Sequence, residues 1–392
     1  MFEMEEVRGQ GANIKVIGVG GAGGNAVNNM IASNLHGVEF IAVNTDSQIL
    51  ETSLATAKVQ IGLEITKGLG AGSNPDIGRE AALEDREAVA ESIRGADMVF
   101  ITAGMGGGTG TGASPVVASV ARELGALTVA IVTKPFFYEG RKRAINADIG
   151  MKELRNNVDA IIVIPNDRIG LVVEKGTPML KSFAVANDVL RQAVQGISDL
   201  ILIPGLINLD FADVKAVMVD AGRAVMGIGL GRGDGGALEA ARKAISNPLL
   251  EDSSTEGAKG IILNITGGLN LSQSSVQDAA GFIYDLADNE ANIIFGAVIN
   301  PDIEDEVRVT VIATGFEEKK EKVELPQVKK WNPVKEPSNF KGSDRVLAKS
   351  LKPYYSALPL PARCEQDAPE LMPYEDPLDV PAFMRKTVQK VI

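Results

Sequence analysis

The chain has 392 residues, of which 45% are hydrophobic, and this is enough for two domains with large cores and a tail. Its formal net charge of −12 argues against nucleic-acid binding as the main activity, because contacts to phosphate backbones need a basic face. The single cysteine, Cys364, excludes an internal disulfide and a cysteine-rich metal site. We expect a cytoplasmic protein without signal peptide or membrane span, since no N-terminal apolar segment and no run of about 18 apolar residues is present.

The first part of the chain, 13–178, alternates short apolar strands with helices, while the polar residues 1–12 are expected to be flexible. Fully apolar strands that alternate with helices favour a parallel sheet covered on both faces. Ligands of such sheets bind at the carboxyl ends of the strands, where the glycine-rich loops of this chain lie. Strands are predicted at 14–19, 40–43, 98–102, 127–133 and 159–164, and helices at 26–33, 76–93 and 116–124.

One glycine-rich stretch, 103–115, stands between a predicted strand and a predicted helix. It has six glycines within nine residues, so its backbone can turn with positive φ and approach a ligand closely. We expect Ser114 to cap the following helix and Pro115 to occupy its first position. Backbone N–H groups, with the hydroxyls of Thr109 and Thr111, would then converge on a phosphate group at the positive end of the helix. The alternative is a mobile surface loop.

Two more glycine-rich loops, 18–25 and 68–75, precede predicted helices. The first fits the G-x-G-x-x-G fingerprint of dinucleotide-binding proteins and alone would suggest an NAD-dependent oxidoreductase. Three glycine loops are more than that fold requires, and the second strand is followed by Asn44 and Thr45 before an acid, Asp46, occurs. The P-loop pattern is absent. The sequence therefore favours another phosphate-binding α/β protein, with a dehydrogenase as the alternative.

The second part of the chain begins with a long helix, predicted at 179–203 because apolar residues recur there every three or four positions. We expect this central helix to join the first domain to a smaller α/β domain at 204–316. In that domain helices are predicted at 211–226 and 237–245, and strands at 260–266, 293–298 and 307–313.

The last part of the chain, beyond residue 316, is rich in proline and in Lys/Glu runs. Such a composition cannot bury enough apolar surface to offset chain entropy, so a disordered linker is predicted at 317–375. Residues 376–392 combine apolar anchors with basic residues and are predicted to be a docking peptide for partner proteins. The alternative is an apolar chain end without a partner.

The signature that identifies a family lies at Gly106 to Gly112, where GGGTGTG closely resembles the glycine loop of the tubulin superfamily. The loop at 18–25, the turn 44–46, the segment GAGSNP at 70–75 and the segment NLDFAD at 208–213 are similar to the bacterial FtsZ family within it. The resemblance covers about residues 12–316 and, separately, the terminal peptide. It implies a Rossmann-like GTPase domain that binds GTP or GDP with Mg²⁺, head-to-tail polymerisation, and hydrolysis at the junction between subunits.

The same resemblance implies which residues bind the nucleotide. Residues 21–25 and 108–110 would hold the phosphates, with the loop at 70–75 near the γ-phosphate. Phe183 would stack on guanine while Asn25 and Asn187 read its edge; Asp188 is the alternative to Asn187, because some relatives exchange the two. The predicted binding residues are Gly21, Ala22, Gly23, Gly24, Asn25, Asn44, Gly72, Ser73, Asn74, Gly106, Gly107, Gly108, Thr109, Gly110, Thr133, Pro135, Glu139, Arg143, Phe183 and Asn187.

Two acids, Asp210 and Asp213, stand three residues apart at a predicted helix start. Such acids commonly cap a helix and interact with its dipole. The family resemblance implies instead that they reach the nucleotide of the next subunit and orient or polarise the attacking water, with Asn208 holding their loop. No protein ligand set for a metal is predicted.

The resemblance also implies partners and a location. The chain would polymerise with itself in the cytoplasm, at the division site on the inner face of the membrane. Membrane-tethering and regulatory division proteins would bind the peptide 376–392, so that contact with the membrane is only indirect, and no nucleic acid is expected. A non-catalytic scaffold of the same fold is the alternative, and the presence of both Asp210 and Asp213 argues against it.

Overall fold

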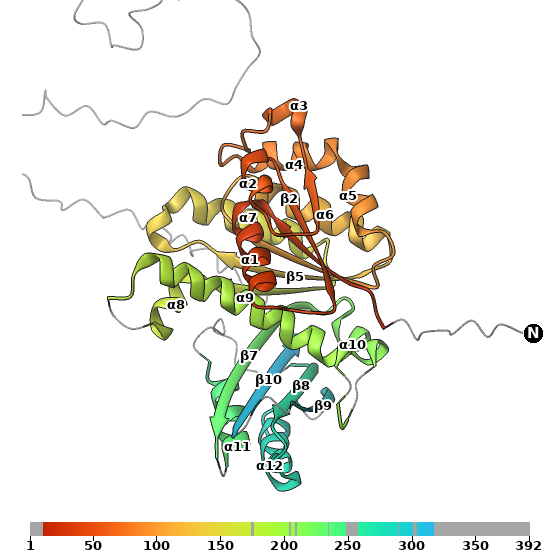
Figure 1. The fold of residues 1–392 in the computed structure, drawn as a ribbon, viewed down its shortest axis with the longest axis vertical. Helices are drawn as coiled ribbons and strands as arrows, with labels where there is room; N and C mark the ends of the chain where they lie inside the picture. The colour runs from red at the N-terminus through yellow and green to blue at the C-terminus, as the bar shows by residue number, and fades with distance from the viewer. Residues whose placement is uncertain are drawn as a thin grey trace, which may run out of the picture. The chain divides into compact units, whose positions relative to one another are not determined.

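The computed structural model describes residues 11–316 apart from 174–175, 204, 208–209, 234, 248–257, 289, 301–302 and 304 (Figure 1). These residues belong to one compact unit. The segment 1–10, the predicted linker 317–375 and the predicted docking peptide 376–392 lie outside the described residues. The predicted boundaries at 178, 203 and 316 stay predictions.

Six parallel strands form the first part of a ten-stranded sheet, in the order β3-β2-β1-β4-β5-β6. Nearly every residue of the inner strands is buried, which is why their sequences read as continuous apolar runs rather than as alternating patterns. This confirms the predicted parallel sheet. The strands are β1 (Ile14–Val19), β2 (Val38–Asn44), β3 (Ala57–Gln60), β4 (Met98–Gly104), β5 (Leu127–Lys134) and β6 (Ala160–Pro165).

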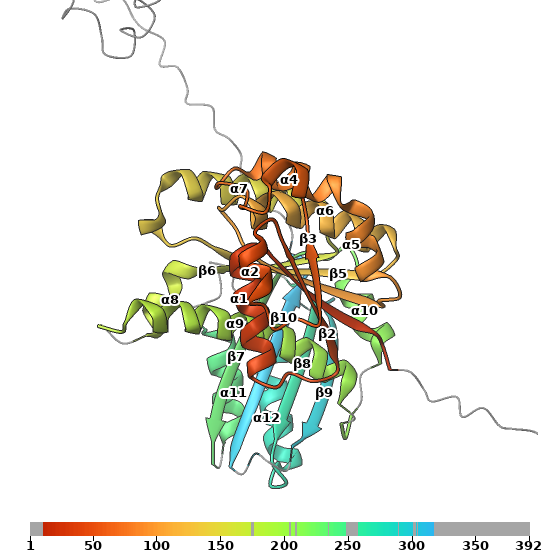
Figure 2. The ribbon, with the colours of Figure 1, turned by 45° about the horizontal axis from the view of Figure 1, so that its top comes forward.

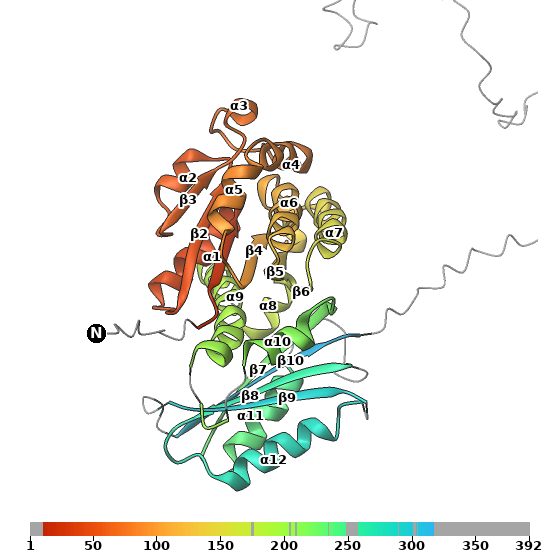
Figure 3. The same ribbon diagram turned by 90° about the vertical axis from the view of Figure 1, so that its right-hand side faces the viewer.

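Helices cover both faces of this parallel part. Helix α1 (Gly20–Ala32) shares one apolar core with α9 (Met179–Leu202) and α10 (Phe211–Met218). The other face is covered by α4 (Pro75–Glu84), α5 (Arg86–Ile93), α6 (Thr109–Glu123) and α7 (Arg141–Arg155). Figure 3 shows α6 and α7 on one side of the strands. Short helices fill the connections: α2 (Ser47–Glu51), α3 (Leu63–Thr66), a 3₁₀ turn (Phe137–Glu139) and α8 (Asn166–Val172).

The predicted long helix is present as α9, and its buried stripe contains Ala186, Leu190, Ala193, Ile197 and Leu200. Its 24 residues span about 36 Å. Its far end lies beside the start of β2, since a Cβ on Gly37 would stand 2.6 Å from Leu202. Figures 1 and 2 show α8 and α10 beyond opposite ends of this helix.

The second part of the sheet continues in the order β7-β10-β8-β9, joined to the first through a short parallel pairing of β6 with β7. Helices α11 (Gly236–Ile245) and α12 (Gln273–Tyr284) cover one face of these strands (Figure 3). A mixed sheet with two helices confirms the predicted smaller α/β part. The strands are β7 (Gly222–Arg232), β8 (Gly260–Gly267), β9 (Asn292–Ile299) and β10 (Glu306–Thr314).

Several predicted elements are wrong in their limits. The helix predicted at 211–226 ends at Met218, because Asp220 and Gly222 adopt positive φ and turn the chain into β7. The helix predicted at 76–93 is divided at Asp85 into α4 and α5. Strands β3 and β7 and helices α7 and α12 were not predicted.

The helix after the signature loop also differs from its prediction. Helix α6 begins at Thr109, so Ser114 and Pro115 lie inside it rather than at its cap. The Ser114 hydroxyl donates to the Gly110 carbonyl at 2.5 Å, one turn earlier in the helix. The glycines of the signature therefore belong partly to the helix, and the first helix likewise begins at Gly20 rather than at residue 26.

Candidate functional site

A cavity of about 700 Å³ opens at the carboxyl ends of the parallel strands. The loops that follow β1, β2, β4, β5 and β6 line it, together with the first turns of α9. Most predicted binding residues meet there: Gly21, Ala22, Asn25, Asn44, Gly72, Ser73, Gly107, Gly108, Thr109, Gly110, Thr133, Pro135, Glu139, Arg143, Phe183 and Asn187. The structure thus brings together residues that span more than 160 positions of the sequence. Their binding roles stay predictions.

Four predicted binding residues do not line this cavity. Gly23 packs on the sheet, where a Cβ would stand 2.4 Å from the Thr102 carbonyl oxygen, and Gly24 is buried within α1. Asn74 accepts from the Asp76 N–H at 3.1 Å and so caps α4. Gly106 is turned away, with its N–H donating to the Thr111 hydroxyl at 2.8 Å. These four residues therefore lie beside the cavity or behind its surface, and their binding roles stay predictions.

Two helix N-termini meet at the cavity. Helices α1 and α6 both begin in glycine loops, and neither has a side chain that caps its first turn. The α2 and α4 termini, in contrast, are capped by Asp46 and Asn74. Uncapped N–H groups at a positive helix end are a ready site for phosphate oxygens. The cavity therefore offers two such ends to one polyanion.

Glycines are required where the two loops touch. A Cβ on Gly110 would lie 2.6 Å from the Gly104 carbonyl oxygen, and a Cβ on Gly20 would lie 2.8 Å from the Gly110 nitrogen. Gly20 also has φ of +71°, a conformation that L residues rarely adopt. Beside them the hydroxyls of Thr45 and Thr109 are 2.7 Å apart, which ties the turn after β2 to the start of α6. The hydroxyl of Thr111 accepts a hydrogen bond within the loop, and this residue lines another cavity.

The amide groups in the cavity are distinctive because two of them are buried without partners. Among the described residues, neither Nδ2 of Asn44 nor Oδ1 of Asn166 has a hydrogen-bond partner. Asn166 is 6% exposed and, like Asn187, lines the cavity. A buried polar atom without a partner is costly, so a ligand that satisfies it gains binding energy. Sequence reasoning missed Asn166, although its position directly after β6 was a signal that could have found it.

Some side chains on and near α9 line the cavity, while others bond to neighbouring residues of the helix. The ring of Phe183 contacts Phe136 edge-on with centroids 5.3 Å apart, which fixes one wall of the cavity. Asn187 lines the cavity, whereas Asp188 pairs with Arg191 at 2.7 Å and accepts from Gln192 at 2.6 Å. The structure thus places Asn187, and not Asp188, at the cavity. On the same rim Glu139 forms an ion pair with Arg143 and accepts from the Phe136 N–H at 2.9 Å.

The two predicted catalytic acids lie elsewhere. Asp210 and Asp213 are exposed at the start of α10, and an oxygen of Asp210 accepts from the Asp213 N–H at 2.7 Å. Helix α10 packs through Val214, Val217 and Met218 in the core that holds the amino ends of β4 and β5. The helix-capping role considered for Asp210 is therefore present. Asn208 lies outside the described residues.

No helix in the described part of the chain is both long and apolar enough to cross a membrane. Among the described residues, no three His, Cys, Asp or Glu side chains gather into a cluster that could hold a metal ion. The acids that line the cavity are Asp46 and Glu139.

Comparisons with known proteins match two parts of the chain. The Tubulin/FtsZ family GTPase domain matches residues 13–174, and the FtsZ family C-terminal domain matches residues 222–317. An FtsZ dimer from M. jannaschii is 43% identical, with a TM-score of 0.75 over 79% of this chain and 89% of that one. The GTPγS-bound protofilament of CetZ2 from Haloferax volcanii is 20% identical, with a TM-score of 0.69 over 78% and 94%. The GDP-bound monomer of CetZ1 from the same organism is 21% identical, with a TM-score of 0.68 over 78% and 95%. The last two likenesses show a shared fold.

Proposed function

The chain belongs to the Tubulin/FtsZ family, and on this premise we propose that it is a self-assembling GTPase whose catalytic site is completed by a second copy. The matched GTPase domain supports GTP and GDP binding and GTP hydrolysis. The observation that carries the rest of the proposal is the separation of the cavity from Asp210 and Asp213.

That separation follows from the length of the elements between them. Phe183 and Leu190, in the first half of α9, line the cavity, while α10 lies beyond the other end of this helix (Figures 1 and 2). The 24 residues of α9 span about 36 Å. The acids of one copy therefore cannot reach their own nucleotide. A head-to-tail neighbour would bring its α10 to the mouth of the cavity.

The cavity residues divide by their chemistry. The uncapped starts of α1 and α6 would hold the phosphates, and Glu139 with Arg143 would contact the ribose. Phe183 would stack on guanine. Asn25, Asn187 and, in addition, Asn166 would read the edge of the base, because an amide offers the donor and the acceptor that guanine requires.

Mg²⁺ is part of the proposal. Bound to a nucleotide, this ion keeps several waters and takes phosphate oxygens, so the absence of a three-acid cluster in the described residues is compatible with it. Glu139 is paired with Arg143, which leaves Asp46 as the lining carboxylate that would contact the water shell of the ion. When bound, the ion supplies positive charge beside the phosphates.

The chemistry that follows is water attack on the γ-phosphorus. The bond from this phosphorus to the β–γ bridging oxygen breaks, GDP keeps that oxygen, and the water's oxygen becomes part of inorganic phosphate. The protons of the water are divided between the phosphate and solvent. Asp210 and Asp213 of the neighbouring copy would orient this water, so that hydrolysis depends on assembly.

In the cell, the proposed filaments would form the cytoplasmic ring of bacterial division. Tethering and regulatory proteins would bind the peptide 376–392 and hold the filaments at the inner face of the membrane. The M. jannaschii relative is archaeal and does not support a bacterial ring in particular. That part of the proposal is supported by the resemblance of the sequence motifs to the bacterial FtsZ family.

The test is the substitution Asp213→Ala. Asp213 is a better target than Asp210, because the side chain of Asp210 caps α10 and its loss would also weaken that helix by about 1 kcal/mol. We expect GTP affinity to stay within about twofold, while turnover by assembled protein falls by about 100-fold or more.

The matched control is Asp278→Ala, which removes an exposed carboxylate from α12 and should leave turnover unchanged. Filter binding or isothermal titration gives the affinity, and phosphate release gives the turnover. Loss of GTP binding in the Asp213 variant would put this acid in its own nucleotide site, and unchanged turnover would remove it from the mechanism.

A further inference from the structure

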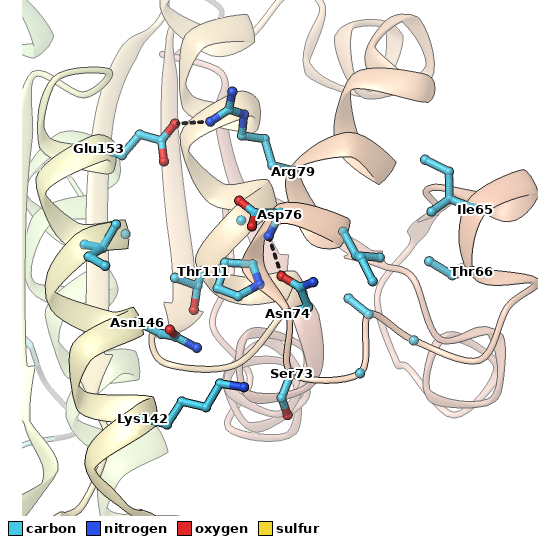
Figure 4. Close-up of a pocket in the computed structure, with 18 residues that line it drawn as sticks. Ile65, Thr66, Ser73, Asn74, Asp76, Arg79, Thr111, Lys142, Asn146 and Glu153 are labelled. Carbon is cyan, nitrogen blue, oxygen red and sulfur yellow. Dashed lines mark hydrogen bonds and ion pairs between the residues drawn. The ribbon is translucent and has the colours of Figure 1, made fainter. Parts of the chain in front are cut away.

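A second cavity, of about 710 Å³ (Figure 4), borders the nucleotide cavity. The two cavities share one wall, formed by Gly70, Gly72 and Ser73, which line both. Behind this wall the second cavity extends between α4 and α7 and over Thr111 and Gly112 of α6. Neither the family resemblance nor the proposed mechanism assigns any role to this space.

The shared wall is thin and has room to move. A Cβ on Gly72 would meet no atom within 4 Å, and all three wall residues have positive φ, Ser73 included. On either side of the tip the chain is anchored: Ala71 is buried where a Cβ on Gly108 would stand 2.8 Å from it, and Asn74 caps α4. The exposed tip at 72–73 can therefore shift without disturbing its anchors.

The charges in the second cavity suit a small anion in transit. Arg79 and Glu153 pair at 3.3 Å and neutralise each other. Lys142 extends from α7 toward the loop that carries Ser73 (Figure 4), and its ammonium group has no hydrogen-bond or ion-pair partner among the described residues. Asp76, across the cavity, offsets this charge. An anion would be attracted by Lys142 but not held tightly.

The proposed function creates a need for such a route. If a neighbouring copy covers the mouth of the nucleotide cavity, inorganic phosphate formed there has Asp210 and Asp213 of that copy on one side. Two carboxylates repel a phosphate anion, so release toward the neighbour is unfavourable. The second cavity opens on the other side of the shared wall.

We propose that inorganic phosphate leaves the assembled enzyme through this second cavity, past the shared wall, and that Lys142 guides it. This inference rests on the proposed function, since an uncovered cavity would need no separate exit. Lys142 is a positioning residue for the product and takes no part in the cleavage of GTP.

The experiment compares cleavage with release in the first turnover of full-length, assembled protein. Acid quenching measures GTP cleaved, and a fluorescent phosphate-binding reporter measures phosphate free in solution. In Lys142→Gln we expect the delay between GTP cleavage and phosphate release to be about fivefold longer than in the unmodified chain. In Lys142→Glu we expect this delay to be longer still. GTP affinity, the cleavage rate and the mass of sedimented polymer should not change.

The matched control is Lys152→Gln, because Lys152 is exposed on the same helix but lines neither cavity. Release that keeps pace with cleavage in both Lys142 variants would overturn the inference, and so would a change confined to the critical concentration, which would make Lys142 a contact between copies. Failure of the proposed function would give a different result, because the unmodified chain would then hydrolyse GTP without assembling.

Discussion

The two ends of the parallel sheet differ in what they hold. Among the described residues, the carboxyl end has a shaped cavity, two uncapped helix termini and two amide groups with an unsatisfied buried atom, but its acids are an ion-paired Glu139 and the capping Asp46. The amino end has two exposed acids on α10, Asp210 and Asp213, and neither lines the nucleotide cavity. Under the proposed function, the carboxyl end binds the nucleotide and the amino end of another copy supplies the carboxylates, so that a complete site takes one end from each of two copies.

The largest expected effect comes from breaking the binding end alone. In Gly110→Ala the new methyl group would stand 2.6 Å from the Gly104 carbonyl oxygen and 3.4 Å from that of Val19. Because backbone atoms on that side cannot yield, the start of α6 must move away from the first loop. We expect GTP affinity to fall by about 100-fold, which corresponds to about 2.7 kcal/mol.

The control for this variant is Gly24→Ala, where the added methyl group meets no atom within 4 Å. It should bind GTP normally and gain about 0.5–1 kcal/mol of stability, because alanine is a better helix former than glycine. Equal loss of binding in both variants would mean that Gly24 contacts the nucleotide and would contradict its place outside the cavity lining.

A smaller loss of GTP affinity is expected when one of the amides proposed to bind guanine is removed. Asn166→Ala removes an amide whose Oδ1 is buried without a partner among the described residues. If this amide bonds guanine, GTP affinity should fall about tenfold, while the stability of the nucleotide-free protein should not fall. Asn146→Ala, on α7 and outside the nucleotide cavity, is the control. Titration with GTP, paired with urea unfolding, distinguishes the assignment from a purely structural role, in which stability falls and affinity does not.

The smallest expected effect is on the stability of the protein, through a buried carboxyl group of α9, the helix between the two ends. Burial raises the pKa of Asp199 to about 6, against a lowering contribution from the Gln195 hydrogen bond and from Arg308 and Arg191. A carboxyl group whose pKa is raised on folding stabilises the fold below the unfolded pKa and loses that stabilisation as pH rises through the folded value. Asp199→Asn removes this pH dependence.

We expect Asp199→Asn to stabilise the protein by about 1 kcal/mol at pH 7.5, a value well below the full shift because the group keeps some contact with water. The gain should shrink as pH is lowered through 6 toward 4. Urea unfolding at several pH values measures it, and a gain that is the same at every pH would contradict the burial of this carboxyl group.

The sequence contains much of the first half of the fold and less of the second. Strands β1, β4 and β5 are fully buried, so each appears as an uninterrupted apolar run. Strand β7 was missed because it contains Gly227 and Gly229, which usually weaken a strand. The structure explains them: a Cβ at either position would stand 1.9 Å from a carbonyl oxygen of α11.

Helix α7 was missed for a related reason. Its buried face consists of small or flexible residues, Ala147, Gly150, Met151 and Leu154, so its apolar pattern is weak. In the site, the glycine loops indicated where a ligand would bind, but not which glycines face it: Gly23 and Gly106 are turned away by contacts with distant parts of the chain. Asn166 shows a related limit: its position after β6 points to the cavity, but only tertiary packing reveals that its Oδ1 is buried without a partner among the described residues.

The most direct test of a site shared between copies is GTP turnover per subunit measured across a range of protein concentrations. Sedimentation of the same samples gives the fraction assembled. The account predicts almost no turnover in dilute, monomeric protein and a sharp rise that begins where assemblies first sediment. Full-rate hydrolysis by a strictly monomeric sample would contradict it.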